Sequence, residues 1–337
     1  MMNWKRWLAI GIAVVLFIGS SILNFATSVF FGESGSALES WLDEGDKEFE
    51  ETVIEEGNTN QKIVVLKLEG VIQDTGSAGG ILQAEGYNHK KFMKQLEQVK
   101  NDNTVKGIIL YVNSPGGGVM ESAQIHDKII EIQEETGKKI YVSMGATAAS
   151  GGYYVSAPAD KIFASPDTLT GSLGVIMQAW NFEGLADKYG VDLVTIKSGP
   201  FKDIMSPVRE VTEEERDILE SMVDNSYNQF VKVIAEGRNL SQSRVRELAD
   251  GRIYDGWQAK DVQLIDEFGY LEDTIDHLKN DLKMKNAQVI EYSSSNSLKT
   301  LFEMRMQSWF SGDQEMTSLV RLMSEFQAPR LMYLYTH

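Results

Sequence analysis

The chain of 337 residues contains no cysteine, and this absence excludes several classes of protein. Disulfide bridges, thiolate zinc sites and thiol catalysis all need cysteine sulfur. The metal-binding pattern His-Glu-x-x-His is also missing, and only four histidines are present. We therefore expect chemistry that uses no metal and no cofactor.

Basic charge is in short supply. Lysine and arginine total 32 against 49 aspartates and glutamates, which gives a formal net charge of −17. Nucleic-acid binding needs a basic face, so we expect no nucleic-acid partner. An excess of one sign keeps copies of a chain soluble through mutual repulsion.

One long apolar run stands out, from Trp7 to Phe31, and Lys5 and Arg6 precede it. About 20 apolar residues span a bilayer. Positive charge before the run places the N-terminus inside. We expect a cytoplasmic segment 1–6, a single-pass transmembrane anchor 7–31 in the cell membrane, and an extracytoplasmic remainder. A cleaved signal peptide is the alternative, but its apolar region of about 7–15 residues is shorter, so we favour the anchor.

The remaining chain divides into three parts. Residues 32–60 are acidic and lack sustained periodicity, which is typical of a linker. Residues 61–295 alternate apolar runs with helical stripes, and this indicates an α/β domain with a mostly parallel sheet and flanking helices. Residues 296–337 form a C-terminal extension. The runs expected to be strands are 63–66, 108–112, 140–142, 161–164 and 191–196.

Ser150 is the first candidate for a catalytic residue. An apolar run, 139–143, precedes it, and Gly151, Gly152 and a helical stretch follow it. A serine at a corner between a strand and a helix exposes its hydroxyl beside the first N–H groups of the helix. This arrangement is typical of a nucleophile, although a plain turn has the same sequence pattern.

The run Gly116-Gly117-Gly118 also follows an expected strand. Glycines leave backbone N–H groups uncovered, and two such donors aimed at one point make an oxyanion hole. A phosphate loop would need Lys after the last glycine, and Val119 stands there; the dinucleotide pattern G-x-G-x-x-G is missing as well. A turn without a ligand remains an alternative.

A serine nucleophile needs a base. None of the four histidines has a sequence setting typical of catalysis, although a Ser-His-Asp triad stays open. The other solution is a neutral lysine, and Lys202 follows Gly199, Pro200 and Phe201 in a loop of low polarity. Burial must lower the pKa of such a lysine from about 10.4. Lys197 is the competing candidate.

Taken together, these motifs resemble bacterial signal peptide peptidase A, the protease IV family of Ser-Lys proteases, in its short single-repeat form. The resemblance implies the α/β fold of the Clp-protease/crotonase type. Pro200 departs from the pattern, two residues before the lysine. The matching motifs are 112–118, 148–154, 169–175 and 197–199 followed by 202–203.

The resemblance implies a role for five residues. Ser150 would be the nucleophile and Lys202 the general base. Ser172 would orient the lysine amine, and the backbone N–H groups of Gly117 and Gly151 would form the oxyanion hole.

The resemblance also implies a function. It is that of a membrane-anchored serine endopeptidase that degrades cleaved signal peptides and other unfolded hydrophobic polypeptides outside the cytoplasm. The short form assembles into a homo-oligomer, an octameric ring, in which neighbouring subunits complete the dyad. The alternatives are a crotonase-like acyl-CoA enzyme and a non-catalytic membrane scaffold.

The apolar end of the chain, 331–335, has two interpretations. It packs on a neighbour as a strand or helix, or it is a substrate-like tail that enters the active site and restrains it.

Overall fold

The computed structural model describes residues 49–74, 87–294 and 330–335. Contacts divide the chain into two units, and the features below lie in the unit that comprises 51–292 and 307–337, apart from the first two residues of β1 and the last two of β10. Its centre is a sheet in the order β1-β10-β2-β3-β5-β6-β9, in which every pairing from β10 to β9 is parallel. The strands are β1 (Phe49–Glu55), β2 (Asn58–Glu69), β3 (Val105–Ser114), β5 (Lys139–Ala149), β6 (Lys161–Ala164), β9 (Glu267–Phe268) and β10 (Ala287–Ser294). The expected α/β fold with a mostly parallel sheet is confirmed.

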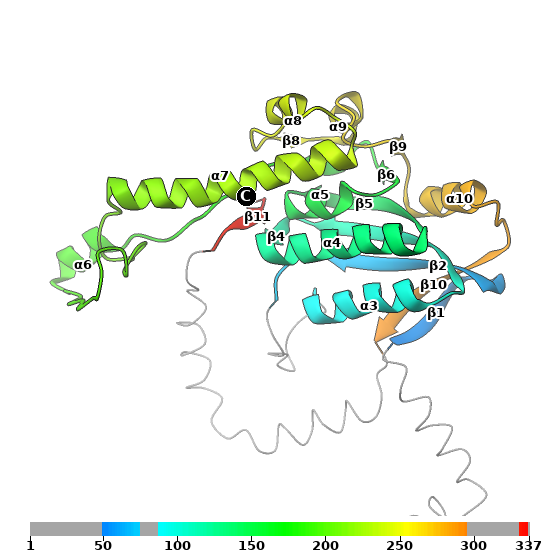
Figure 1. The fold of residues 1–337 in the computed structure, drawn as a ribbon, viewed down its shortest axis with the longest axis horizontal. Coiled ribbons are helices and arrows are strands. Elements are labelled where there is room, and N and C mark those ends of the chain that lie inside the picture. The colour runs from blue at the N-terminus through cyan, green and yellow to red at the C-terminus, as the bar shows by residue number, and fades with distance from the viewer. Residues whose placement is uncertain (1–48, 75–86, 295–329, 336–337) are drawn as a thin grey trace, which may run out of the picture. The chain divides into compact units, whose positions relative to one another are not determined.

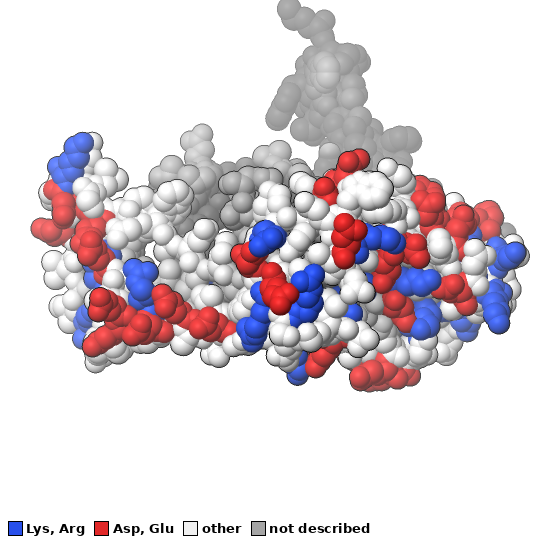
Figure 2. Space-filling model, turned by 90° about the horizontal axis from the view of Figure 1, so that it is seen from above, with Lys and Arg blue, Asp and Glu red and all other residues white. Residues whose placement is uncertain are grey.

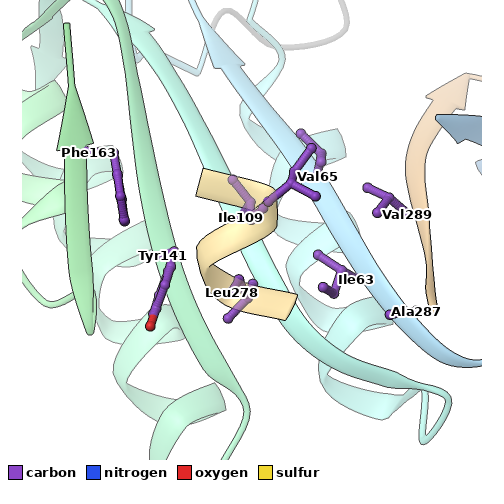
Figure 3. Close-up of a cluster of buried hydrophobic side chains, with 9 residues drawn as sticks. Ile63, Val65, Ile109, Tyr141, Phe163, Leu278, Ala287 and Val289 are labelled. Carbon is purple, nitrogen blue, oxygen red and sulfur yellow. The ribbon is translucent and has the colours of Figure 1, made fainter. Parts of the chain in front are cut away.

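The central strands are apolar on both faces because helices cover both faces. In β2, Ile63 and Val65 pack with Leu278 of α10 (Leu271–Asp281), as Figure 3 shows. The alternate residues Val64 and Leu66 are equally buried and point to the opposite face. Helices α3 (His89–Asn101), α4 (Val119–Thr136) and α5 (Gly151–Ser156) lie side by side in Figure 1.

Short strands extend the structure where the central strands end. The last residues of β5 pair in parallel with β7 (Leu169–Gly171), which pairs antiparallel with β8 (Ile253–Tyr254). After β3, β4 (Gly116–Gly118) pairs antiparallel with β11 (Met332–Leu334). Helices α8 (Gln242–Leu248) and α9 (Gly256–Asp261) flank β8 in sequence. The carboxyl ends of β3, β5 and β7 therefore share one edge, the usual place for a site in parallel sheets.

Residues 180–211, which we call the arm, contain α6 (Glu183–Tyr189) and precede α7 (Glu213–Gly237). Figure 1 shows α6 beyond the first turn of α7, away from α5. The expected strand 191–196 is wrong: these residues form no strand, and Val194 and Ile196 are 84% and 97% exposed. An apolar run becomes a strand only where a sheet edge is available to it.

Helix α7 begins as the sequence predicts. Thr212 and Glu215 form the capping box, with each side chain bonded to the other's backbone N–H. Of the apolar stripe along α7, Phe230, Val231 and Ile234 are buried, whereas Met222 is exposed. The second half of α7 thus packs in the core, whereas the first half, which follows the arm, is mostly exposed.

Several sequence expectations fall on other parts of the chain. Segments 1–6 and 7–31 lie outside the described residues, as do residues 296–329 of the extension. Within the segment expected to be a linker, 32–60, the part from 49 onward forms β1 and the start of β2. In the part of the chain that the structure describes, no helix is long and apolar enough to cross a bilayer.

Acidic and basic side chains intermingle over the right-hand part of the face drawn in Figure 2. Many form ion pairs: Lys128 of α4, for example, pairs with Glu97 of the neighbouring helix α3 and with Glu131 of its own helix. Exposed pairs of this kind stabilise a fold by about 1 kcal/mol or less. Their larger effect is on how the surface attracts charged partners.

Candidate active site

Ser150 occupies the corner between β5 and α5, as the sequence predicts. Its backbone has φ 53° and ψ −116°, a conformation that L-residues rarely adopt and that stores strain. Two hydrogen bonds hold it: the Ser150 N–H donates to the Gly171 carbonyl at 2.8 Å, and the Ser150 carbonyl accepts from the Tyr154 N–H at 2.9 Å. We expected an exposed hydroxyl, but Ser150 is only 1% exposed.

Ser172 lies beside Ser150. The parallel register pairs Ala149 with Gly171, so the residues that follow, Ser150 and Ser172, leave the sheet next to each other. Ser172 also has a positive φ, 49°, and its N–H donates to the Arg252 carbonyl at 2.7 Å. The structure thus brings together two of the serines that the sequence singled out.

The glycine strand β4 has backbone neighbours on both edges. On one edge the Ile72 N–H donates to the Gly116 carbonyl at 2.8 Å, and the Gly118 N–H donates to the Ile72 carbonyl at 2.7 Å. A Cβ atom at Gly117 would overlap the Ile72 carbonyl. Gly116, with φ 98°, makes the turn into the strand. The Gly117 N–H consequently faces the other edge.

The other edge of β4 is covered by residues 330–335, which we call the tail. In this pairing Tyr333 lies opposite Gly117. On one side of this pair the Tyr335 N–H donates to the Pro115 carbonyl at 2.8 Å, and on the other side the Val119 N–H donates to the Leu331 carbonyl at 3.4 Å. In an antiparallel ladder, hydrogen-bonded pairs recur at every second residue. Tyr333 and Gly117 are therefore such a pair, and the Gly117 N–H is aimed at the Tyr333 carbonyl.

Gly151 meets the same carbonyl. A Cβ atom built on Gly151 would lie 3.1 Å from the Gly117 nitrogen and 3.1 Å from the Tyr333 oxygen. The first N–H groups of a helix have no partner within the helix. Gly151, the residue directly after Ser150, therefore lies close to both the Gly117 nitrogen and the Tyr333 carbonyl oxygen.

The tail lies in an extended slot. On its second edge, Met332 and Ile176 exchange two backbone hydrogen bonds of 3.0 Å each. The Tyr333 side chain is fully buried, with its ring centroid 4.9 Å from that of Tyr154 and 4.6 Å from that of Phe230. Burial raises the pKa of the Tyr333 phenol, which stays protonated and donates to the Ser226 carbonyl at 3.0 Å.

The structure does not bring Lys202 to Ser150. The Lys202 side chain is exposed in the arm, and no hydrogen bond or ion pair among the described residues joins it to Ser150. In Figure 1 the segment between α6 and α7 lies beyond the first turn of α7, whereas α5 lies near the C-terminal half of α7. The alternative bases are no nearer: within residues 49–74, 87–294 and 330–335, no histidine bonds to Ser150, and His337 lies outside these residues.

The loop that carries Lys202 is held by a cluster of charges. Asp203 accepts from Lys197 at 2.6 Å and from Arg209 at 2.9 Å, and Arg209 also donates to Glu215 at 2.8 Å. The hydrogen bonds from Arg209 lower the pKa of Asp203 and lower that of Glu215 to about 2. Lys197 is thus engaged in an ion pair beside Lys202.

Sequence reasoning missed two residues of the site, Glu121 and Ser122. The Ser122 side chain is fully buried, its hydroxyl has no partner among the described residues, and it lies beside Gly151. The Glu121 carboxylate lies against Gly118. Because α4 begins directly after the glycine strand, its first turn had to adjoin the site, and this was the available signal. In the part of the chain that the structure describes, no group of His, Asp or Glu side chains is arranged to hold a metal ion.

A serine at a strained corner between strand and helix, a glycine strand whose Gly117 N–H faces a peptide carbonyl, and an extended slot are features of a serine hydrolase that acts on a peptide-like group. Comparison with known proteins agrees. Residues 132–285 match Peptidase family S49, and residues 82–170 match Clp protease. The chain belongs to peptidase family S49 and is a serine peptidase.

Individual relatives cover much of the chain. It is 44% identical over 299 residues to a candidate signal peptide peptidase SppA of Enterococcus faecium, which covers 88% of this chain and 86% of that one. It is 39% identical over 219 residues to a candidate protease, MJ0651, of Methanocaldococcus jannaschii, with 65% of this chain and 70% of the relative covered. It is 34% identical over 224 residues to protease 4 of Haemophilus influenzae, with 66% of this chain and 35% of the relative covered.

The backbone strain at Ser150 predicts that a glycine at this position gives a more stable protein than an alanine. Glycine adopts positive φ without strain, whereas alanine keeps the Cβ atom. The Ser150→Gly variant should therefore unfold in urea with a free energy about 1 kcal/mol higher than that of Ser150→Ala. Both variants lack the hydroxyl, so the difference isolates the backbone. Equal stabilities would show that the corner carries no strain in solution.

The charge cluster in the arm predicts an acid-dependent stability. Because the pKa of Glu215 is lowered, its contribution is full above the ordinary carboxyl pKa of about 4.3 and is lost as the pH falls towards about 2. Glu215→Gln should flatten the decrease in unfolding free energy between pH 5 and pH 3. Glu214→Gln, at the exposed neighbouring position, is the matched control and should follow the wild type. A wild-type slope in Glu215→Gln would contradict this account.

Proposed function

We propose that this serine peptidase is a membrane-anchored endopeptidase with a Ser150–Lys202 dyad, which degrades cleaved signal peptides and other unfolded hydrophobic polypeptides outside the cytoplasm. The observation that carries the proposal is the tail, which lies as a strand across the glycine strand with the Tyr333 carbonyl facing Gly117 and Gly151. A substrate peptide bound in the same way would present its scissile carbonyl to the Ser150 hydroxyl.

The chemistry follows from that placement. The neutral Lys202 amine accepts the hydroxyl proton as the Ser150 Oγ bonds to the carbonyl carbon, and the carbonyl π electrons move to oxygen. The N–H groups of Gly117 and Gly151 stabilise this oxyanion; one such donor is worth about 3 kcal/mol. The carbonyl then re-forms, the C–N bond breaks, and the lysine ammonium protonates the departing nitrogen. Water attacks the resulting ester, with Lys202 accepting its proton and returning it to the Ser150 oxygen.

Lys202 of a second copy would serve as the base in this scheme. The Lys202 loop is exposed and is held firmly by its charge cluster, so it is presented outward. Burial against a neighbouring copy is the environment in which a lysine amine gives up its proton near neutral pH. Ser172, next to Ser150, would then accept a hydrogen bond from this amine and orient it.

The arm supports assembly of several copies. It exposes many large apolar side chains, and a contiguous patch of this kind marks an interface. We propose that a second copy covers it, in a closed homo-oligomeric ring that the family resemblance suggests is an octamer. The exposed apolar side chains of the arm are Trp180, Phe182, Leu185, Tyr189, Val191, Leu193, Val194, Ile196 and Phe201.

The apolar run 7–31 would hold this ring at the membrane, with residues 1–6 in the cytoplasm. Residues 61–295 would form the catalytic domain, which the preceding segment joins to the anchor. Peptides released in the bilayer would reach the slot over a short distance. The extended slot favours a peptide over an acyl-CoA thioester, because both edges of the tail are bonded backbone to backbone.

The shared dyad predicts complementation between inactive variants. Ser150→Ala and Lys202→Ala should each lower kcat/KM on a quenched signal-peptide substrate by about 10³-fold or more. If neighbours complete the dyad, co-assembled mixtures should recover about a quarter of the wild-type rate, since one site in four combines both intact residues. Each variant alone, refolded by the same protocol, is the control. Loss of activity without complementation would place both residues in one chain, and an active Lys202→Ala would reject the lysine as base.

The tail predicts self-restraint. Deletion of residues 331–337 should raise kcat/KM, because a peptide no longer has to displace the tail from the glycine strand. Tyr333→Ala, which empties the pocket of Tyr154 and Phe230, should raise it in the same direction. A synthetic peptide of residues 329–335 should inhibit the deleted variant competitively. An unchanged rate and an unchanged assembly after deletion would show that the tail is not in the slot in solution.

A further inference from the structure

Arg330 begins the tail, and its side chain is only partly exposed. One guanidinium nitrogen donates to the Gln73 side-chain oxygen at 2.9 Å, and the other lies 3.7 Å from a Glu121 carboxylate oxygen. The side chains of Arg330 and Glu121 are 34% and 13% exposed. Such a half-buried ion pair is screened less by solvent than a surface pair.

The position of Glu121 is fixed by the same segments that form the active site. Its carboxylate accepts a hydrogen bond from the Asp74 N–H at 3.0 Å and lies against Gly118 at the end of the glycine strand. The pKa of the nearby Tyr87 phenol is raised by burial and also by the negative charges of Glu121 and Asp74. The pocket around Arg330 is therefore electrostatically negative.

The register fixes the distance from this pocket to the site. Counting from Tyr333, whose carbonyl faces Gly117, Arg330 is the fourth residue on the N-terminal side of the bond between Tyr333 and Leu334. Leu331 is still bonded to Val119, so the ladder continues to the residue next to Arg330. Backbone pairing does not depend on side-chain identity. Any peptide bound in this register would place its own fourth residue between Gln73 and Glu121.

We propose that Gln73 and Glu121 form a specificity site for a cationic side chain, arginine above all, at the fourth residue before the scissile bond of the substrate. This inference rests on the proposed function, because it takes the tail to lie where a substrate peptide would bind. A planar guanidinium bonds to the Gln73 oxygen and the Glu121 carboxylate at once, which a lysine ammonium does less well.

The order of residues in the tail suggests which substrates fit. A basic residue is followed directly by Leu331, Met332, Tyr333 and Leu334. Signal peptides have the same order, a positively charged segment and then an apolar one. The site would direct cleavage to the boundary between the two segments.

The test uses four quenched peptides that differ only at the fourth residue before the cleaved bond: Arg, Lys, Leu or Glu. Full-length protein in detergent should cleave the Arg peptide with a kcat/KM about tenfold above that of the Leu peptide, with the Glu peptide slowest. Glu121→Gln keeps an acceptor for the Asp74 N–H but loses the charge, and it should reduce the Arg-to-Leu ratio to about twofold or less. The Arg-to-Leu ratio of kcat/KM is the quantity to measure. Damage to the segment around Asp74 would slow the cleavage of all four peptides alike, and the tail competes equally with each peptide, so neither effect changes the ratio.

Two controls sharpen the result. Glu134→Gln removes an exposed carboxylate from the same helix and should leave the Arg-to-Leu ratio at its wild-type value. Binding of the four peptides to Ser150→Ala, by fluorescence anisotropy, separates recognition from cleavage. Arg-selective binding that Glu121→Gln abolishes, without any cleavage by the wild type, would uphold this site and reject the proposed peptidase chemistry. Equal binding or equal cleavage of all four peptides, or no binding of any, would overturn the inference.

Discussion

The close approach of main chains at Gly116, Gly117 and Gly118 is the constraint on which the site depends. Ile72 bonds to one edge of this strand, the tail bonds to the other, and Gly151 meets it end-on. A Cβ atom at Gly116 or Gly117 would overlap a carbonyl oxygen of a neighbouring segment. The Gly117 N–H that faces the Tyr333 carbonyl is a backbone group, so its position is fixed by sheet register rather than by a side-chain rotamer. Groups held in this way need little reorganisation when charge develops on an oxygen.

The parallel register extends the same constraint to Ser150. Because β5 pairs with both β3 and β7, the glycine strand, Ser150 and Ser172 leave the sheet at one edge. The strained backbone of Ser150 persists because Gly171 holds its N–H and the buried helix α5 holds its carbonyl. The backbone position of Ser150 is thus set by the fold itself. Lys202 is placed by different forces, a charge cluster in the exposed arm, and so the two halves of the proposed dyad belong to separately stabilised parts of the chain.

This division explains which features the sequence could predict. Four of the five expected strands, the corner at Ser150 and the capping box at Thr212 and Glu215 depend on local patterns, and the structure confirms them. The run 191–196 has the same apolar pattern as a core strand, but in the structure it pairs with no sheet edge and its side chains are exposed, and a pattern alone does not show whether a sheet edge is within reach. The cover of the tail over the glycine strand depends on pairing between residues far apart in sequence, Gly117 and Tyr333, and such register leaves no local signal.

A slot that binds a peptide by its backbone accepts many sequences, so its selectivity has to come from side-chain pockets at fixed register positions. Successive side chains of an extended strand point to opposite faces. Tyr333 and Arg330 are three residues apart, about 10 Å along the strand, and so they project to opposite faces of it. One face offers the aromatic pocket of Tyr154 and Phe230, and the other offers Gln73 and Glu121. Under the proposed function, a peptide that fills both pockets would carry an apolar side chain at the cut and a positive charge three residues earlier. The two pockets would then select among sequences, which the backbone bonds alone do not.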